Sequence, residues 1–313
     1  MLDKISFTNK KRRSRYVRDL KNPPRMKITD RDTEIVKIVA DFRFATVKQV
    51  ALMVNANDQT TRIRMYLLWQ NKFLDRLNLP VFVGEGSPPS VYVIGPRGKR
   101  LLAENLGVDP NGIVKVDCSR NYFFLLNHTL RRNDFRAVLY AACRERPDLK
   151  FLFWKQDKDV GDSIRIEYGR YGNLKRVPLV PDGFFGIQTP SERIYAYVEI
   201  DQGTIGHKKF LEKQRGYFKW WLQGKHLQKY GEKNFRILTV TTNPRRMANL
   251  VYTTLRVKDS KEGSGFFWFT TFDQINPESP LKIFDPIWIR AVASNGHLWP
   301  LIGRLEEYPI STG

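Results

Sequence analysis

The sequence predicts an α+β protein of two domains, and three observations predict this fold class. The front of the chain holds three helix-like segments followed by two strand-like segments. The remainder alternates strand-like and helix-like segments, as expected for helices packed on a mixed central sheet. The turn-rich stretch NLGVDPNGIVKVDCS separates the two patterns. At 313 residues, the chain is long enough to build two hydrophobic cores.

Four parts follow from these patterns. We expect a basic arm over residues 1–27, a first domain over 28–106, a linker over 107–122, and a second domain over 123–313 that includes a C-terminal extension. The arm carries 10 Lys and Arg against 2 acids, so it cannot build a core. We expect its basic residues to lie along DNA phosphates, namely Lys10, Lys11, Arg12, Arg13 and Arg15. A solvated tail is the alternative.

The first domain begins with three segments of helical periodicity, ITDRDTEIVKIVADFR, TVKQVALMVN and QTTRIRMYLLWQNKFLDRL. PVFVGEGSPPSVYVIG then predicts two strands around a turn, and PRGKRLLAENL predicts a closing helix. This order is that of a winged helix-turn-helix. In the third helix, we expect Ile63 and Leu67 to face the core.

The first turn of that third helix offers side chains of the types that reach base edges and phosphates. They are Gln59, Thr60, Thr61, Arg62 and Arg64. Together with the basic arm, they favour double-stranded DNA as the partner. Winged helices also dock on other proteins, and this alternative stays open, as does a homodimer.

In the second domain, the sequence predicts helices and strands in an order that begins α-β-β-β-α-β. YFFLLNHTLRRNDFRAVLYAACRERP is one long helix or two short ones, and KFLFWKQ is a strand. IRIEYGRYGNLKRVPLVPDGFFGI is a hairpin whose second arm carries Pro181 and Asp182, and IYAYVEID is the next strand. IGHKKFLEKQRGYFKWWLQGKHLQKYG is helical. NFRILTVTT, PRRMANLVYTTLRV and GFFWFTTFDQI give a strand, a helix and a last strand.

Three carboxylates fall on neighbouring strands of this order. Because side chains alternate between the faces of a strand, Glu199 and Asp201 point to one side, and Asp182 on the preceding strand can join them. Clustered carboxylates repel each other unless a cation neutralises them. Oxygen ligands suit Mg²⁺ or Mn²⁺, so the three residues are candidate metal ligands. Ordinary turn chemistry before a glycine is the alternative for Asp182 and Asp201.

This arrangement resembles the PD-(D/E)xK nuclease fold, in which a metal ion polarises a phosphodiester and activates water. The chain departs from that motif, because Asp201 stands where the usual lysine follows the glutamate. Lys213 on the next helix, with Tyr217 on the same face, can supply the positive group. The same helix is basic at its start, and we expect Lys208 and Lys209 to face phosphates.

The composition favours a polyanionic partner. The net charge is +21, and nucleic acid is the usual partner of such a chain. No apolar run approaches the roughly 20 residues of a membrane-spanning helix, and we expect no secretory signal. Cys118 and Cys143 are too few for a disulfide framework or a zinc site. We therefore expect a cytoplasmic, prokaryotic protein with no membrane partner.

Several motifs follow each other in a fixed order along the chain. They are Tyr92-Val93-Ile94 with Gly98, His128, Pro181-Asp182, Val198-Glu199-Ile200-Asp201 with Gly203-Thr204, and Lys213 with Tyr217. This ordered set resembles the replication-relaxation family of plasmids and other mobile elements, over about residues 28–245. Members tend to carry a tryptophan and a nearby acid before the hairpin, whereas here Gln156 and Asp157 follow Trp154. The resemblance implies a role in replication, mobilisation or regulation, with replication or transfer proteins of the same element as partners.

We therefore expect a DNA-binding protein of a plasmid, phage or other mobile element. If the second domain is active, its reaction is metal-dependent nicking of DNA near a replication or transfer origin. Asp182 and Glu199 would then hold the metal, Asp201 would assist or position water, and Lys213 would stabilise charge. One alternative is a non-catalytic transcriptional regulator or replication accessory factor with an inactive nuclease-like scaffold. A relaxase that uses Tyr217 as a covalent nucleophile is a further alternative.

Overall fold

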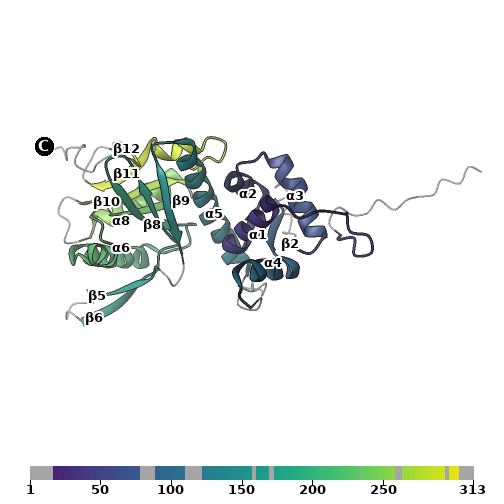
Figure 1. Ribbon diagram of the computed structural model, residues 1–313. Coiled ribbons are helices and arrows are strands. Elements are labelled where there is room, and N and C mark those ends of the chain that lie inside the picture. Colours follow the sequence, from purple (N-terminus) through teal and green to yellow (C-terminus); the bar gives the residue numbers. More distant parts are fainter. Residues whose placement is uncertain are drawn as a thin grey trace, which may run out of the picture. The chain divides into compact units, whose positions relative to one another are not determined.

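The computed structural model describes residues 17–77, 89–109, 122–156, 160–168, 173–233, 235–257, 263–292 and 296–302. The chain divides into two compact units, residues 1–118 and residues 119–313, and each is described by itself. Figure 1 shows both units and labels many of their helices and strands.

The first unit combines four helices with a small antiparallel sheet. Its elements are, in chain order, α1 (Asp30–Phe42), β1 (Ala45–Thr46), α2 (Val47–Val54), α3 (Asp58–Gln70), β2 (Leu74–Leu77), β3 (Val91–Ile94) and α4 (Pro96–Leu106). The sheet has the strand order β1-β3-β2. The apolar stripe of α1, which includes Ile35, Val36, Val39 and Phe42, is buried, so helical spacing positions this helix on the core.

Helix α3 differs from the sequence expectation in two ways. It ends at Gln70 instead of continuing through Leu77, because Lys72 adopts a φ of 65° and the following residues pair with β3. Ile63 was expected in the core and is 53% exposed, whereas Met65 and Leu68 are fully buried. The buried side of α3 is therefore rotated from the expected one. The turn expected between the two wing strands falls in residues 78–88, which lie outside the described residues.

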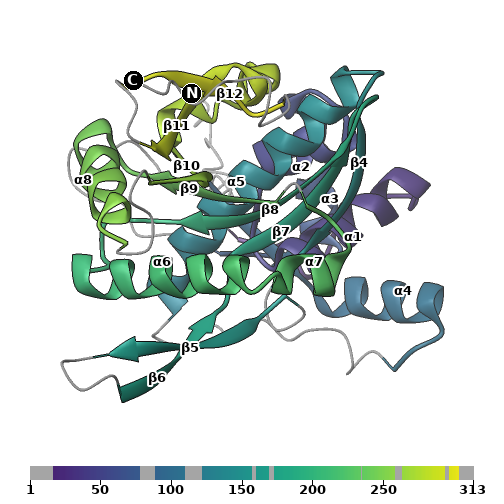
Figure 2. The ribbon, with the colours of Figure 1, turned by 90° about the vertical axis from the view of Figure 1, so that its left-hand side faces the viewer.

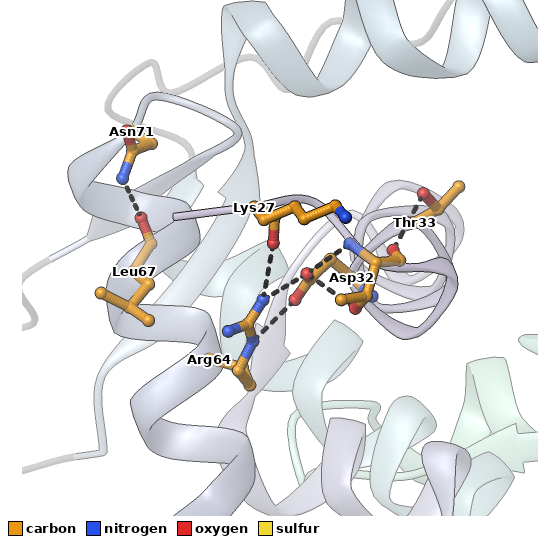
Figure 3. Close-up of polar contacts among 7 residues, drawn as sticks. Lys27, Asp32, Thr33, Arg64, Leu67 and Asn71 are labelled. Carbon is orange, nitrogen blue, oxygen red and sulfur yellow. Dashed lines mark hydrogen bonds and ion pairs between the residues drawn. The ribbon is translucent and has the colours of Figure 1, made fainter. Parts of the chain in front are cut away.

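A buried ion pair fixes the start of α1 against α3 (Figure 3). Thr29 caps α1, and its backbone N–H and hydroxyl donate to the Asp32 carboxylate at 2.9 and 2.8 Å. Arg64 of α3 donates to the same carboxylate through Nε at 2.9 Å and through Nη2. Asp32 is fully buried. Burial by itself would raise the pKa of Asp32, but its hydrogen bonds with Arg64 and Thr29 hold that pKa below the ordinary value.

The second unit is built around a mixed sheet of seven strands, which confirms the predicted sheet type. Its elements are α5 (Tyr122–Glu145), β4 (Lys150–Lys155), β5 (Asp162–Tyr168), β6 (Asn173–Leu179), β7 (Gly183–Gln188), β8 (Arg193–Ile200), α6 (His207–Leu222), α7 (Lys225–Tyr230), β9 (Phe235–Thr241), α8 (Pro244–Leu255), β10 (Gly263–Thr271), η3 (Phe272–Gln274), η4 (Pro280–Phe284), β11 (Pro286–Val292) and β12 (Leu298–Pro300). The strand order is β12-β11-β10-β9-β8-β7-β4. Strands β8, β9 and β10 are parallel, and every other neighbouring pair in the sheet is antiparallel.

Helices cover both faces of this sheet. On one face, Tyr197 of β8 and Phe267 of β10 belong to a buried cluster that also contains Phe210 and Trp220 of α6. On the other face, the ring of Phe135 of α5 lies 6.1 Å from that of Phe185 of β7. Within the part of the chain that the structure describes, no helix is both long and apolar enough to span a bilayer.

Strands β5 and β6 form a hairpin of their own. The sequence predicts one hairpin that runs to Ile187, but its second arm divides into β6 and β7, with Pro181 between them. Proline lacks the N–H that a continuous ladder needs, so it suits this break. Helix α6 lies between the central sheet and the β5–β6 hairpin (Figures 1 and 2). Gly216 allows the close approach, because a Cβ there would lie 3.0 Å from Leu179 Cδ2.

Replacing Arg64 by alanine is expected to destabilise the first unit by about 3–5 kcal/mol, because the buried Asp32 carboxylate loses its cation. Arg62→Ala is the matched control, since Arg62 is exposed on the same helix, and it should change stability by less than about 0.5 kcal/mol. Urea unfolding followed by circular dichroism measures both effects. Equal stabilities of the two variants would contradict the structural role of Arg64.

Candidate functional site

Two carboxylates meet where strands β7 and β8 begin to separate. Gly183 pairs with Val198 in the antiparallel register, so the preceding residue, Asp182, stands opposite Glu199. The Asp182 N–H donates to the Val198 carbonyl at 2.9 Å, and the Ile200 N–H donates to Asp182 Oδ2 at 2.7 Å. Asp182 precedes the first residue of β7, and its charge raises the pKa of Glu199, so the two carboxylates lie near each other.

Glu199 is buried, and two residues of α6 bind its carboxyl oxygens. Lys213 Nζ donates to Glu199 Oε2 at 2.5 Å, and the Tyr217 hydroxyl donates to Glu199 Oε1. Lys213 Nζ also donates to the Val180 carbonyl at 3.2 Å. Burial raises the pKa of Glu199, the Lys213 charge opposes this shift, and the nearby Asp182 charge adds to it. Burial and the Glu199 charge together raise the pKa of Tyr217 well above its ordinary value.

Asp182 is held by a histidine from the opposite layer of helices. His128 Nε2 of α5 lies 3.3 Å from Asp182 Oδ2. Burial opposes the charged form of both groups, but their contact raises the pKa of His128 and lowers the pKa of Asp182. Residues from the helices on both faces of the sheet therefore bind the two carboxylates. We call these five residues the Glu199 group: His128, Asp182, Glu199, Lys213 and Tyr217.

Asp201 does not join this group, which corrects the expectation of three clustered carboxylates. Its carboxylate accepts from Thr241 Oγ1 at 2.6 Å, and from Arg246 Nε and Nη2 at 2.9 and 3.1 Å. Asp201 is 3% exposed, so its charge is neutralised inside the fold by Arg246 of α8. Strand alternation predicts the direction of a side chain but does not reveal an arginine that comes 45 residues later.

Two buried polar side chains near the Glu199 group lack a hydrogen-bond partner among the residues that the structure describes. Gln214 lies between Lys213 and Tyr217 in sequence and is fully buried, and both polar atoms of its amide are unpartnered. Thr239, the partner of Glu199 on β9, is fully buried with an unpartnered hydroxyl. Buried polar groups are normally hydrogen-bonded, so these atoms are suited to bind water or polar atoms of a ligand.

A divalent metal ion fits the site only in part. Among the described residues, no group of three His, Cys, Asp or Glu side chains could hold a metal. Because Thr241 and Arg246 already bind the Asp201 carboxylate, only the oxygens of Asp182 and Glu199 are left as candidate metal ligands. Two carboxylates are suitable ligands for Mg²⁺ or Mn²⁺, although Lys213 supplies a positive charge at Glu199 in the present arrangement.

The candidate DNA-binding residues divide into exposed and structural ones. Gln59, Thr60 and Arg62 are exposed on α3, and Lys208 and Lys209 are exposed at the start of α6. Thr61 is 2% exposed and Arg64 binds Asp32. Neither side chain is available to contact DNA, contrary to the expectation from the sequence. Both errors arise because the buried side of α3 is rotated from the predicted one. The arm residues from Lys10 to Arg15 lie outside the described residues.

Tyr217 and His128 belong to the ordered motifs of the sequence, but neither was predicted as a metal ligand of the candidate site. The spacing of four residues between Lys213 and Tyr217 is the signal that could have included the tyrosine, because it places both on one helix face. His128 and Asp182 are far apart in sequence, so no local spacing indicates their contact.

Comparison with known proteins identifies one family. The family model described as replication-relaxation matches residues 36–234. No curated protein matches the chain. Among solved structures, the restriction endonuclease FokI is similar with a TM-score of 0.29 and 10% sequence identity, over 82% of this chain and 45% of FokI. The chain spans less than half the length of that enzyme, and a similarity this low supports no conclusion about activity.

The contact between His128 and Asp182 predicts a dependence of stability on pH. Because the folded pKa of His128 is raised above 6.5, its stabilising contribution is complete below pH 6.5 and is lost as pH rises through the folded value. The thermal midpoint of the wild type should therefore fall more between pH 6 and pH 9 than that of His128→Gln. His297→Gln, which replaces an exposed histidine, should follow the wild type. Identical pH profiles for all three proteins would contradict the contact.

Proposed function

The chain belongs to the replication-relaxation family, and we propose that it acts on the DNA of a plasmid, phage or other mobile element, in replication or transfer. The family assignment supports the link to replication. The net charge of +21 supports a polyanionic partner. Double-stranded DNA satisfies both, with replication or transfer proteins of the same element as further partners.

We propose that the first unit is a winged helix that holds the duplex through α3. The order of α1, α2, α3 and the strands β2 and β3 supports this assignment. Gln59, Thr60 and Arg62 are exposed along the first turns of α3. These side chains carry the donors and acceptors that recognise base edges in the major groove. The basic arm would add phosphate contacts, and a second copy of the chain would extend the site to a dimer.

The second unit is proposed to hold a phosphodiester of that DNA at the Glu199 group. The single observation that supports this best is that Asp182, Glu199 and Lys213 converge at one end of the sheet. A bound Mg²⁺ or Mn²⁺ would be held by Asp182 and Glu199 and would polarise the phosphodiester. Lys213 would stabilise negative charge on the phosphate, and Tyr217 would orient Glu199. The reaction would be nicking of one strand.

A non-catalytic replication accessory factor or transcriptional regulator is the second candidate. It is favoured by one specific observation, that Lys213 and Tyr217 already bind both oxygens of Glu199. In this alternative, the Glu199 group is an internal ion pair and the first unit alone recognises DNA.

Supercoiled plasmid DNA that carries the origin of the element distinguishes the two candidates. With Mg²⁺ or Mn²⁺, the wild type should convert it to the nicked form, and Glu199→Gln should lower the rate by about 10²-fold or more, because the variant removes a charged ligand. Lys282→Gln, at an exposed lysine of η4, is the control for loss of one charge and should retain the wild-type rate. Agarose gel electrophoresis measures the conversion. A nicking rate that does not depend on the metal and is the same in wild type and Glu199→Gln would favour the non-catalytic candidate.

Recognition by α3 is tested with a pool of randomised duplexes. Arg62→Ala should reduce discrimination between bound and unbound sequences by about 1–3 kcal/mol, because one direct base contact is lost. Arg100→Ala, at an exposed position of α4, should leave discrimination unchanged. Sequencing of the bound fraction gives the affinity ratios. The same preferences in wild type and Arg62→Ala would exclude this residue as a base-reading group.

A further inference from the structure

The β5–β6 hairpin presents a pair of like charges that the Glu199 group does not use. Its inner residues, including Ile164 and Val177, pack in the same buried cluster as α6. Its next pair, Arg165 and Arg176, stand directly opposite each other, and both are exposed. Like charges in direct cross-strand register are unfavourable, so this hairpin is less stable alone than with an anion beside the two guanidinium groups.

The same arginines line a hollow of about 450 Å³ together with two lysines. Lys219 of α6 and Lys225 of α7 contribute from the helical side, and none of the residues that line this hollow is acidic. Arg176 Nε donates to Ser163 Oγ at 2.9 Å, which fixes one arginine at the wall. Four cationic side chains therefore surround one open, water-accessible hollow, which we call the hairpin hollow.

A second hollow, of about 580 Å³, extends the first toward the Glu199 group. It shares Ser163 and Arg176 with the hairpin hollow and reaches Val180. The Val180 carbonyl accepts a hydrogen bond from Lys213, the lysine that binds Glu199. Asp162, an acid in its wall, is bound by the Trp220 indole N–H and the Ser163 N–H, both at 2.7 Å. These bonds compensate the only acid that lines either hollow within the described residues.

We propose that the hairpin hollow binds the phosphates of a DNA strand and that the second hollow leads this strand to the Glu199 group. The inference rests on the proposed function and adds a DNA contact in the second unit, separate from α3. Guanidinium groups bind phosphate oxygens with two parallel hydrogen bonds, and ammonium groups bind them as point charges. A chain of regularly spaced phosphates is the ligand that matches several cations along one surface.

Fluorescence anisotropy with labelled DNA tests the proposal on the full chain, with single-stranded and duplex forms of one sequence. The double variant Arg165→Gln and Arg176→Gln should weaken binding by about tenfold or more near 0.1 M salt. The slope of log K against log salt for the duplex should decrease in magnitude by about 1.8, as expected for the loss of two phosphate contacts. The single variant Arg165→Gln keeps the Arg176–Ser163 bond and should lose about half of that slope.

Matched controls separate this proposal from the function proposed above. Arg256→Gln with Lys282→Gln removes two exposed charges elsewhere in the second unit and should bind as the wild type does. The double variant Arg165→Gln and Arg176→Gln is called the hairpin variant. If it binds DNA as tightly as this control while Arg62→Ala still alters sequence preference, the hairpin hollow is excluded as a DNA contact and the proposed function stands. If the wild type does not bind DNA, both fail. Weakened binding to phosphatidylserine vesicles with unchanged binding to DNA would also overturn the proposal.

The hairpin variant is expected to fold normally, because both arginines are exposed and their removal relieves a like-charge pair. Its thermal midpoint should equal or exceed that of the wild type. If its thermal midpoint is lower and its DNA binding weaker, the loss of binding is attributed to structural damage, and the proposal is overturned. The exception is that Arg165→Gln alone has the wild-type midpoint and still weakens DNA binding.

Discussion

The second unit is organised around a negative charge inside a sheet. Glu199 lies on β8, an interior strand of the seven-stranded sheet, and is 8% exposed. An uncompensated carboxylate at such a position would cost several kcal/mol, so the fold requires partners that reach it. Lys213 and Tyr217 of α6 provide them, one as a cation and one as a hydroxyl donor. The position of α6 on the sheet is therefore set by charge compensation as well as by apolar packing.

This constraint connects parts of the unit that are far apart in sequence. Helix α6 presents Tyr217 to the sheet and Gly216, the preceding residue, to the β5–β6 hairpin. A single helix thus holds the Glu199 group on one side and carries the hairpin on the other. The second hollow reaches Val180, whose carbonyl binds Lys213 of the Glu199 group. A ligand bound at the hairpin would accordingly lie against the element that positions the candidate reactive groups.

Local patterns in the sequence predict some of these features well and others not at all. The antiparallel connection that brings Asp182 near Glu199 is local in sequence. The contacts of Asp201 with Arg246 and of Arg64 with Asp32 join distant residues, and no periodicity reveals them. The burial of Thr61 and the exposure of Ile63 depend on how α3 is rotated about its axis against the core. The sequence does not determine this rotation, because several residues in the first turns of α3 are polar. The division of the predicted hairpin at Pro181 depends on which strand β7 joins in the finished sheet.

The composition of the Glu199 group is compatible with the phosphodiester site proposed above. A buried ion pair is seldom the most stable choice, since well-packed apolar residues of similar volume are often equal or better. Here a second carboxylate, Asp182, lies near the first and raises its pKa, which makes the arrangement less favourable still. The buried amide of Gln214, without a partner among the described residues, adds a further cost. A scaffold needs none of these features, whereas a site that binds and polarises a phosphodiester needs carboxylates, a cation and polar atoms at one end of a sheet.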